Sequence, residues 1–367
     1  MAQEFLSASC IAKESLVRLR NNLVLGALVH RDFDCECASA GDVIQIRKPA
    51  TFTATEFTGS NADAQDIVED KAVVTLDKIA DVTVSVTSKE LTLNIQDFGR
   101  QVVEGAVLAL AEKIESDLMS LYQCTAYTSG TAGQEMDSLK DIAGARKVLN
   151  ENRVPMGNRH LVVGPDAESN LIILDAIASA NRFGSTQALR EASLGRIFGF
   201  DMWMSQSVPT HTAGTATSYS VAGTEGQLTL SVTSATNGHT FKKGDLISVA
   251  DIDQTFVVAE DVTVAETIAT VKITEPVEET FSAADGTTTA THSANVGFHR
   301  DAFALVTRPM ALPMGGASGA IENYEGLTVR VTMGYDMATK TNTISFDILY
   351  GIKCLDPRLA VRVWKIA

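Results

Sequence analysis

The chain has 367 residues and a formal net charge of −15, a length suited to two or three subdomains rather than one small core. An acidic surface repels nucleic acid at long range, so the charge argues against a repressor or a nucleic-acid motor subunit. Hydrophobic residues make up 45% of the chain and aromatic residues only 6%. This composition suits strands and loops better than large apolar binding pockets.

The five cysteines form no disulfide or metal framework that the sequence can identify. Only Cys35 and Cys37 are close together, and a single intervening residue is a poor spacing for either bond type. Free thiols indicate a reducing compartment. Residues 1–16 lack the basic and apolar regions of a signal peptide, and no apolar run reaches the length of a membrane span. We therefore expect a cytoplasmic product without a membrane partner.

Residues 7–29 have a helical pattern with one apolar side and one basic side. The basic side carries Lys13, Arg18 and Arg20. In an acidic chain, such a helix could dock an acidic partner, or its charges could simply face solvent. The apolar positions, which recur at loosely helical spacing, are Ile11, Leu16, Leu19, Leu23 and Leu28.

An arm is predicted within residues 41–88. Strands at 41–47 and 73–87 flank a polar loop, 50–70, that is much longer than ordinary connections. Loops of this length are usually functional or disordered. The charges of the loop could pair with basic groups on a neighbouring molecule, or they could be solvated. These charges are mostly acidic and belong to Glu56, Asp63, Asp66, Glu69, Asp70 and Lys71.

The most informative stretch is a long helix predicted over residues 97–122. Asp97 can cap its start, and charged residues such as Glu112 and Glu115 lie largely off the apolar face. Because the apolar face is a single stripe, the helix should lie on a sheet rather than inside a bundle. Its apolar positions recur at steps of four and three: Val103, Val107, Leu110, Ile114, Leu118 and Leu121.

Shorter elements follow this helix. A helix is predicted over 138–150 with Ser138 or Asp137 as its cap, and a buried strand over 160–163 lies between two turn signals. Pro165 opens the next helix at the first position, where proline belongs.

Residues 210–296 differ in composition from their surroundings. Short alternating strands indicate a small antiparallel barrel or sandwich, and Thr/Ala/Gly/Ser-rich linkers at 210–223 and 282–295 indicate an insertion into a host domain. The strands expected within it cover 227–232, 246–249, 255–258, 262–264 and 269–273.

The host domain resumes at residue 297 with a strand that ends at Pro309. Residues 310–324 are expected to form a loop, and 359–366 one more extended segment. Residues 327–333 and 344–350 alternate as the two strands of a hairpin, whose apolar face is suited to receive the long helix.

No catalytic site is predicted. The six histidines are scattered and none lies four residues from another, which excludes an HExxH zinc site. Nucleophile-elbow, P-loop and kinase motifs are absent. Asp251 and Asp253 resemble the start of a calcium loop but lack its later glycine and glutamate. We expect a non-enzyme with no cofactor and no metal.

The order of these elements resembles that of the major capsid proteins of tailed bacteriophages, with the Hong Kong 97-type fold. The most telling segments are 152–165, NRVPMGNRHLVVGP, and 194–209, LGRIFGFDMWMSQSVP. Segments 229–252, 262–276 and 299–313 look like the podovirus coat proteins that carry a telokin-like insertion domain. The implied fold class is α+β: N-terminal arm, extended loop, peripheral domain with a long spine helix, axial domain and an inserted small antiparallel β-barrel or sandwich.

The resemblance implies a division of the chain into five parts. These are an N-terminal helix and arm at 1–40; an extended β-hairpin loop at 41–88; a peripheral domain at 89–155 and 320–350 with the spine helix 97–122; an axial domain at 156–209, 297–319 and 351–367; and an inserted β-domain at 210–296.

It also implies a function in assembly. Copies of the chain would form pentamers and hexamers of an icosahedral procapsid, which expands around packaged double-stranded DNA. The implied partners are other copies, a scaffolding protein, a portal protein and optionally a decoration protein, with DNA only near the inner surface. The expected location is the virion, after assembly in the host cytoplasm.

Two sets of residues take roles under this resemblance. Glu56, Asp66, Glu69 and Lys71 of the extended loop would contact a neighbouring subunit. Lys13, Arg18 and Arg20 would contact the scaffolding protein. Some members of the fold crosslink a lysine of the loop to an asparagine. Lys48, Lys71 and Asn342 are available here, but relatives with the insertion are not expected to crosslink, and we expect no such bond.

Two alternatives stay open from the sequence. One is an encapsulin-like nanocompartment shell with a protein cargo, against which the inserted β-domain counts. The other is an extracellular carbohydrate-active or adhesin β-protein, against which the missing signal peptide, few aromatic residues and lack of a paired catalytic site count.

Overall fold

The computed structural model describes residues 8–31, 43–47, 71–87, 103–178, 194–313, 318–324 and 327–366. The chain divides into two compact units. Unit 1 comprises Met1–Leu23, Arg31–Lys113 and Ala304–Leu355, and unit 2 comprises Val24–His30, Ile114–Phe303 and Asp356–Ala367. In the described part of the chain, no helix has the length and apolar content needed to cross a membrane.

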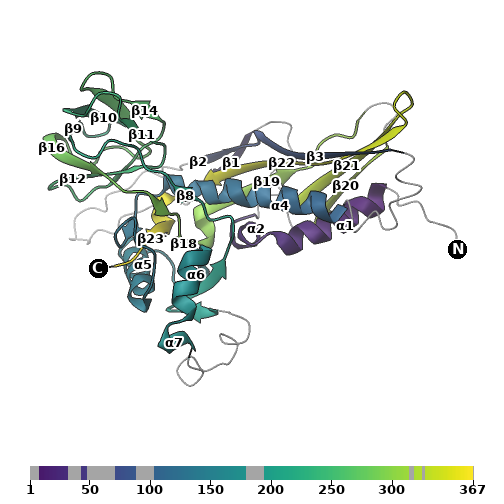
Figure 1. Ribbon diagram of the computed structural model, residues 1–367, viewed down its shortest axis with the longest axis horizontal. Coiled ribbons are helices and arrows are strands. Elements are labelled where there is room, and N and C mark those ends of the chain that lie inside the picture. The colour runs from purple at the N-terminus through teal and green to yellow at the C-terminus, as the bar shows by residue number, and fades with distance from the viewer. Residues whose placement is uncertain are drawn as a thin grey trace, which may run out of the picture. The chain divides into compact units, whose positions relative to one another are not determined.

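Unit 1 is built on a five-stranded sheet (Figure 1). The 14-residue strand β22 lies at its centre, and it pairs antiparallel with β21 along one edge and with β3 along the other. The predicted hairpin is confirmed as β21 and β22, and its alternating apolar side chains, among them Val331 and Phe346, are buried. The strands are β3 (Lys78–Thr87), β19 (Phe303–Arg308), β20 (Ser318–Tyr324), β21 (Leu327–Asp336) and β22 (Thr341–Cys354).

The expected loop at 310–324 is wrong in its second half, which forms the edge strand β20. Ser318–Tyr324 pairs residue for residue with β21, from Ser318 opposite Met333 to Tyr324 opposite Leu327. Gly319 and its small neighbours have low strand propensity by themselves. The partner strand supplies the hydrogen bonds that make this segment a strand.

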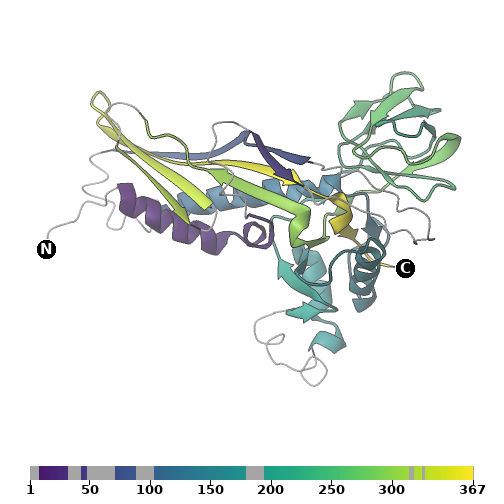
Figure 2. The same cartoon turned by 180° about the vertical axis from the view of Figure 1, so that it is seen from behind.

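Two helices accompany this sheet. The N-terminal helix α1 (Ala8–Asn22) packs against β20 and β21, and its predicted apolar positions, such as Ile11 and Leu19, are buried. Figures 1 and 2 show the first part of the long helix α4 (Glu104–Met119) running along the sheet near α1. An ion pair of 3.0 Å between Arg18 Nη1 and Glu104 Oε2 joins the two helices.

The long predicted helix is confirmed as α4, followed by a 3₁₀ turn, η3 (Ser120–Cys124). Residues 97–102 of the prediction lie outside the described part. All six predicted apolar positions are buried, from Val103 at 0% exposure to Leu121 at 8%. Glu115 differs from its prediction because it is 6% exposed.

The base of the predicted arm is a two-stranded antiparallel ribbon. Strands β1 (Val43–Arg47) and β2 (Lys71–Thr75) pair so that Arg47 stands opposite Lys71, where the loop between them begins and ends. Ile44, Ala72 and Val74 pack with Ala304 and Val306 of β19. The two strands are thus confirmed, and residues 48–70 lie outside the described part.

Unit 2 contains a six-stranded mixed sheet with helices beside it. The strands follow the order β4 (Thr128–Ser129), β23 (Ala360–Val363), β18 (Val296–His299), β5 (Arg159–Val163), β7 (Phe200–Met204) and β6 (Arg196–Ile197). Its helices are α2 (Leu25–Leu28), α5 (Leu139–Glu151), α6 (Pro165–Ile172) and α7 (Asp175–Ala178), with short 3₁₀ turns η4 (Arg300–Ala302) and η5 (Pro357–Leu359).

The predicted starts of α5 and α6 are both confirmed. At the start of α5, Ser138 and Asp141 form a capping box, in which each side chain accepts a hydrogen bond from the backbone of the other residue. Pro165 occupies the first turn of α6, as expected. Leu161, Val163 and Phe200 of the sheet are fully buried in a core that both helices share.

A second six-stranded sheet of unit 2 has its own core. Every pair in it is antiparallel, and Val221, Phe241 and Ile247 are among the fully buried side chains. The strands, in order across the sheet, are β13 (Phe256–Val257), β12 (Leu246–Val249), β16 (Phe281–Thr288), β9 (Tyr219–Gly223), β10 (Thr229–Thr233) and β15 (Ala269–Lys272). Two small ribbons join β11 (Thr240–Phe241) with β14 (Val262–Thr263), and β8 (Thr210–His211) with β17 (His292–Ser293).

The predicted linkers at 210–223 and 282–295 are wrong, because β9 and β16 are the two central strands of this sheet. Their small residues make room for aromatic rings. A Cβ on Gly286 would lie 2.6 Å from Cε2 of Tyr219, and one on Gly223 would lie 2.7 Å from Cε1 of Phe281. The glycines that suggest flexibility in the sequence are therefore required by close packing.

Candidate functional site

The four predicted contact residues of the arm are placed only at its base. Lys71 opens β2 opposite Arg47. Glu56, Asp66 and Glu69 lie outside the described residues. Their role in a contact between subunits stays a prediction.

The three basic residues predicted on the N-terminal helix all belong to α1. The Lys13 side chain is 70% exposed, and its Nζ lies 4.0 Å from Glu322 Oε1. Arg18 is held within unit 1, because its Nη2 donates to Glu14 Oε1 at 2.9 Å and its Nη1 lies 3.0 Å from Glu104. These contacts raise the pKa of Arg18, with the Glu14 hydrogen bond first. Arg20 is placed on the helix, and its side chain lies outside the description.

A chain of three buried polar groups is the most organised polar site of unit 2. The Tyr122 hydroxyl lies 2.7 Å from His211 Nδ1, and His211 Nε2 lies 2.8 Å from Asp245 Oδ1. Because the carboxylate can only accept, Nε2 carries the proton and Nδ1 accepts from Tyr122. Asp245 also accepts from the backbone amides of Gly214 and Lys242.

Burial decides what this chain of groups can do. A hydroxyl, an imidazole and a carboxylate in series are the groups of a nucleophilic triad. Here Tyr122 and His211 are each 4% exposed and Asp245 is fully buried. Burial also raises the pKa of the Tyr122 hydroxyl. Among the described residues, these three side chains are therefore buried hydrogen-bond partners of one another.

Arg362 of β23 completes the network from a fully buried position. Its Nε donates to the Tyr122 carbonyl at 3.1 Å, and its Nη1 donates to the Gly244 carbonyl at 2.8 Å. Its guanidinium lies 5.1 Å from the centre of the Tyr122 ring, a cation–π distance. Burial lowers the pKa of Arg362 to about 10.

His292 packs beside this network between two other rings. Its ring centre lies 5.0 Å from that of His211 and 4.5 Å from that of Trp364. Its Nδ1 donates to the Ala290 carbonyl at 2.7 Å. Burial, followed by the charge of Arg362, lowers the pKa of His292 to about 4.

The network joins segments that are distant in the sequence. The turn η3 after the long helix supplies Tyr122, and the β8–β17 ribbon supplies His211 and His292. The turn before β12 supplies Asp245, and the C-terminal strand supplies Arg362. It therefore ties both ends of the 210–296 segment to the rest of unit 2. Sequence reasoning missed these residues. The one signal available was that a histidine lies near each end of that segment.

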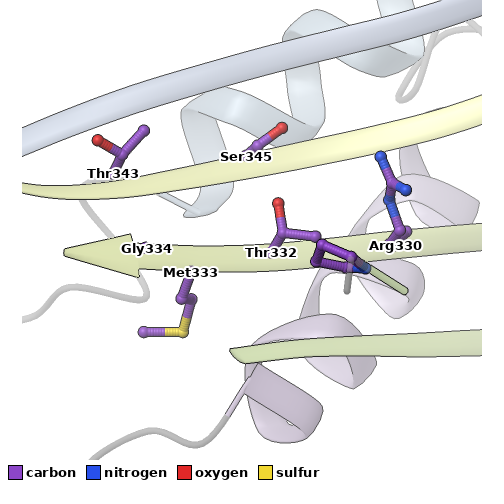
Figure 3. Close-up of a pocket in the computed structure, with 7 residues that line it drawn as sticks. Arg330, Thr332, Met333, Gly334, Thr343 and Ser345 are labelled. Atoms are coloured by element: carbon purple, nitrogen blue, oxygen red, sulfur yellow. The ribbon is translucent and has the colours of Figure 1, made fainter. Parts of the chain in front are cut away.

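A shallow pocket lies on the unit 1 sheet (Figure 3). Arg330 and Thr332 of β21 and Thr343 and Ser345 of β22 line it from adjacent strands. The Arg330 guanidinium is already engaged, because its Nη2 lies 2.7 Å from Asp347 Oδ2 and its Nη1 donates to the Ala311 carbonyl. Among the described residues, no group of histidine, cysteine or acidic side chains is arranged to hold a metal ion.

Comparison with solved structures gives the fold over most of the chain. A structure of Mycobacterium phage Che8 matches with a TM-score of 0.54 and 16% sequence identity, over 92% of this chain and 90% of the other. The chain has the Hong Kong 97-type fold of tailed-phage major capsid proteins.

Two capsid structures are similar at lower TM-scores. The capsid of Ralstonia phage GP4 has a TM-score of 0.47 and 10% identity, over 93% of this chain and 88% of the other. The capsid of a native GTA particle has a TM-score of 0.48 and 9% identity, over 90% and 86%. No protein-family model and no curated protein matches the sequence. The capsid fold predicted from the order of elements is confirmed.

Proposed function

We propose that this chain is a major capsid protein, which self-assembles into the icosahedral shell of a tailed phage. The observation that carries the proposal is the capsid fold over 92% of the chain. The arm base, the long helix and the five-stranded sheet stand in the chain order expected for such a subunit. We infer a structural role for the chain, because the strongest candidate for catalytic chemistry, the Tyr122–His211–Asp245 network, is buried.

The parts of the chain then take distinct roles in the shell. The β1–β2 ribbon carries an extended loop toward a neighbouring subunit. The long helix and the β21–β22 hairpin form the peripheral domain, and the mixed sheet of unit 2 forms the axial domain around the centre of each pentamer or hexamer. The sheet formed within residues 219–288 serves as the inserted β-domain, a role supported by its separate core.

Several partners belong to this proposal. A scaffolding protein would bind α1 through Lys13, whose side chain is 70% exposed, with Arg18 and Arg20 nearby. A portal protein would occupy one vertex, and packaged DNA would lie near the inner surface. Each contact can be weak, because every subunit makes many and the effective concentration rises as the shell closes.

Charge reversal on the arm tests its role in assembly. The double variant Asp66→Lys/Glu69→Lys should lose shell formation while the monomer stays folded, because the arm charges would then repel the basic groups they meet on a neighbour. Size-exclusion chromatography measures shells in the void volume, and circular dichroism measures folding.

The matched control is Glu278→Lys/Glu279→Lys, which makes the same charge change at two exposed positions of the β-domain. It should assemble like the unmodified chain. Normal shells from the arm variant would show that assembly does not need the arm charges. They would not bear on the capsid fold.

A further inference from the structure

Three strands of the unit 1 sheet place charged residues in one cross-strand row. Arg330 of β21 stands opposite Asp347 of β22, and Asp347 stands opposite Asp81 of β3. Side chains directly opposite each other on antiparallel strands lie on the same face and in contact range. Two carboxylates are therefore neighbours, an arrangement that destabilises a sheet when both are charged.

Arg330 neutralises only one of these carboxylates. Its Nε and Nη2 lie 3.0 and 2.7 Å from the same atom, Asp347 Oδ2. Asp81 has no ion pair within the described part of the chain. Thr83 Oγ1 lies 3.1 Å from each of its carboxylate oxygens.

A single hydroxyl lies between the two acids. Ser345 Oγ is 2.7 Å from Asp81 Oδ1 and 2.5 Å from Asp347 Oδ1. A serine hydroxyl has one hydrogen and can donate to only one of them. The other short contact requires a hydrogen from a carboxyl group. Figure 3 shows Ser345 on the strand next to that of Arg330, and both residues line the pocket.

We propose that Asp81 and Asp347 share one proton at neutral pH, and that this proton fastens β3 to β22. The protonated acid donates to Ser345 Oγ, and the serine hydroxyl donates to the other carboxylate, so each of the two short serine contacts has a hydrogen. The remaining negative charge is balanced by Arg330. The species bound between Asp81 and Asp347 is thus a proton.

The electrostatics of the two acids support this assignment. Asp347 is 5% exposed, and burial, followed by its hydrogen bond with Asp81, raises its pKa. The same hydrogen bond lowers the pKa of Asp81. Among the described residues, Arg330 is the only cation that acts on either acid. Interacting acids of this kind lose their protons in two separated steps.

The attachment of β3 to β22 should therefore depend on pH. An acid whose pKa is raised by folding contributes stability at low pH, and that contribution is lost as pH rises through the raised pKa. For Asp81 the pKa is lowered, so its contribution is lost as pH falls through the lowered pKa. The attachment of β3 is therefore strongest between the two steps. Since β3 begins three residues after β2 ends, a rise in pH would loosen the strand next to the arm base.

Infrared spectroscopy of the full chain tests the shared proton directly. A protonated carboxyl absorbs separately from a carboxylate, so the unmodified chain at neutral pH should show this band. Asp81→Asn should lose one carboxyl from it, because the amide supplies a permanent donor and Asp347 is then ionised. Asp77→Asn, an exposed acid just before β3, is the matched control and should keep the band.

Chemical unfolding at a series of pH values from neutral upward gives the second readout. The unmodified chain and Asp77→Asn should lose stability over this range, and Asp81→Asn should lose less. Equal carboxyl bands in Asp81→Asn and Asp77→Asn, or identical pH profiles for all three chains, would overturn the proposal. Because the Asp81 side chain is exposed, its replacement leaves a folded protein to measure.

Discussion

Asp245→Ala is expected to lower the free energy of unfolding by about 3–5 kcal/mol, the usual cost of removing one partner from a buried charged network. The carboxylate is fully buried and accepts hydrogen bonds from His211 Nε2 and from the amides of Gly214 and Lys242. Alanine would leave all three donors without an acceptor. It would also remove the negative charge that acts on buried Arg362. Chemical unfolding of the unassembled chain, followed by circular dichroism, measures the loss.

Asp253→Ala is the control for this variant. Asp253 is exposed and lies in the same sheet region, so its replacement should change stability by less than about 0.5 kcal/mol. An Asp245→Ala variant as stable as this control would show that the buried network contributes nothing to the fold.

Acid is expected to weaken the same network through His292. Folding lowers its pKa from 6.5 to about 4, so the unfolded chain takes up the proton first as pH falls. Stability is therefore complete above about pH 6.5 and is lost progressively down to about pH 4. A shift of this size corresponds to about 3 kcal/mol at 1.36 kcal/mol per pKa unit.

Replacement of His292 isolates this contribution from other acid effects. His292→Gln cannot be protonated, so its loss of stability between neutral pH and about pH 4 should be smaller than that of the unmodified chain. His239→Gln, at a half-buried histidine of the same region, should behave like the unmodified chain. The same acid loss in all three proteins would exclude His292 as the acid-sensitive group.

Elements with strong local periodicity could be predicted from the sequence. The face of α4 from Val103 to Leu121 and the β21–β22 hairpin were both predicted in place, because a repeating apolar pattern reports which side faces a core. Pro165 and Ser138 marked helix starts for equally local reasons, a fixed backbone angle and a cap.

Elements that depend on distant partners could not be predicted. Strands β9, β16 and β20 contain small residues that read as loop, and each becomes a strand only through its neighbours in the sheet. Glu115 was expected to lie off the apolar face. It is buried because its Oε1 accepts from the Val24 and Leu25 amides at the start of α2, and burial raises its pKa.

The candidate sites likewise contain some features that the local sequence predicts and others that depend on distant partners. The basic residues of α1 were found from helical spacing, but the engagement of Arg18 by Glu14 and Glu104 needed the fold. The Asp81–Asp347 pair joins residues from opposite ends of the chain, and no motif marks either one. The buried network around Asp245 is likewise assembled from five separate segments.

Electron microscopy of the purified chain, expressed alone and together with a candidate scaffolding protein from the same genome, tests the capsid function most directly. The account predicts closed shells of uniform diameter, built from pentamers and hexamers in which the 50–70 loop of one copy lies across the next. Particles that remain monomers or small open oligomers under both conditions would contradict it.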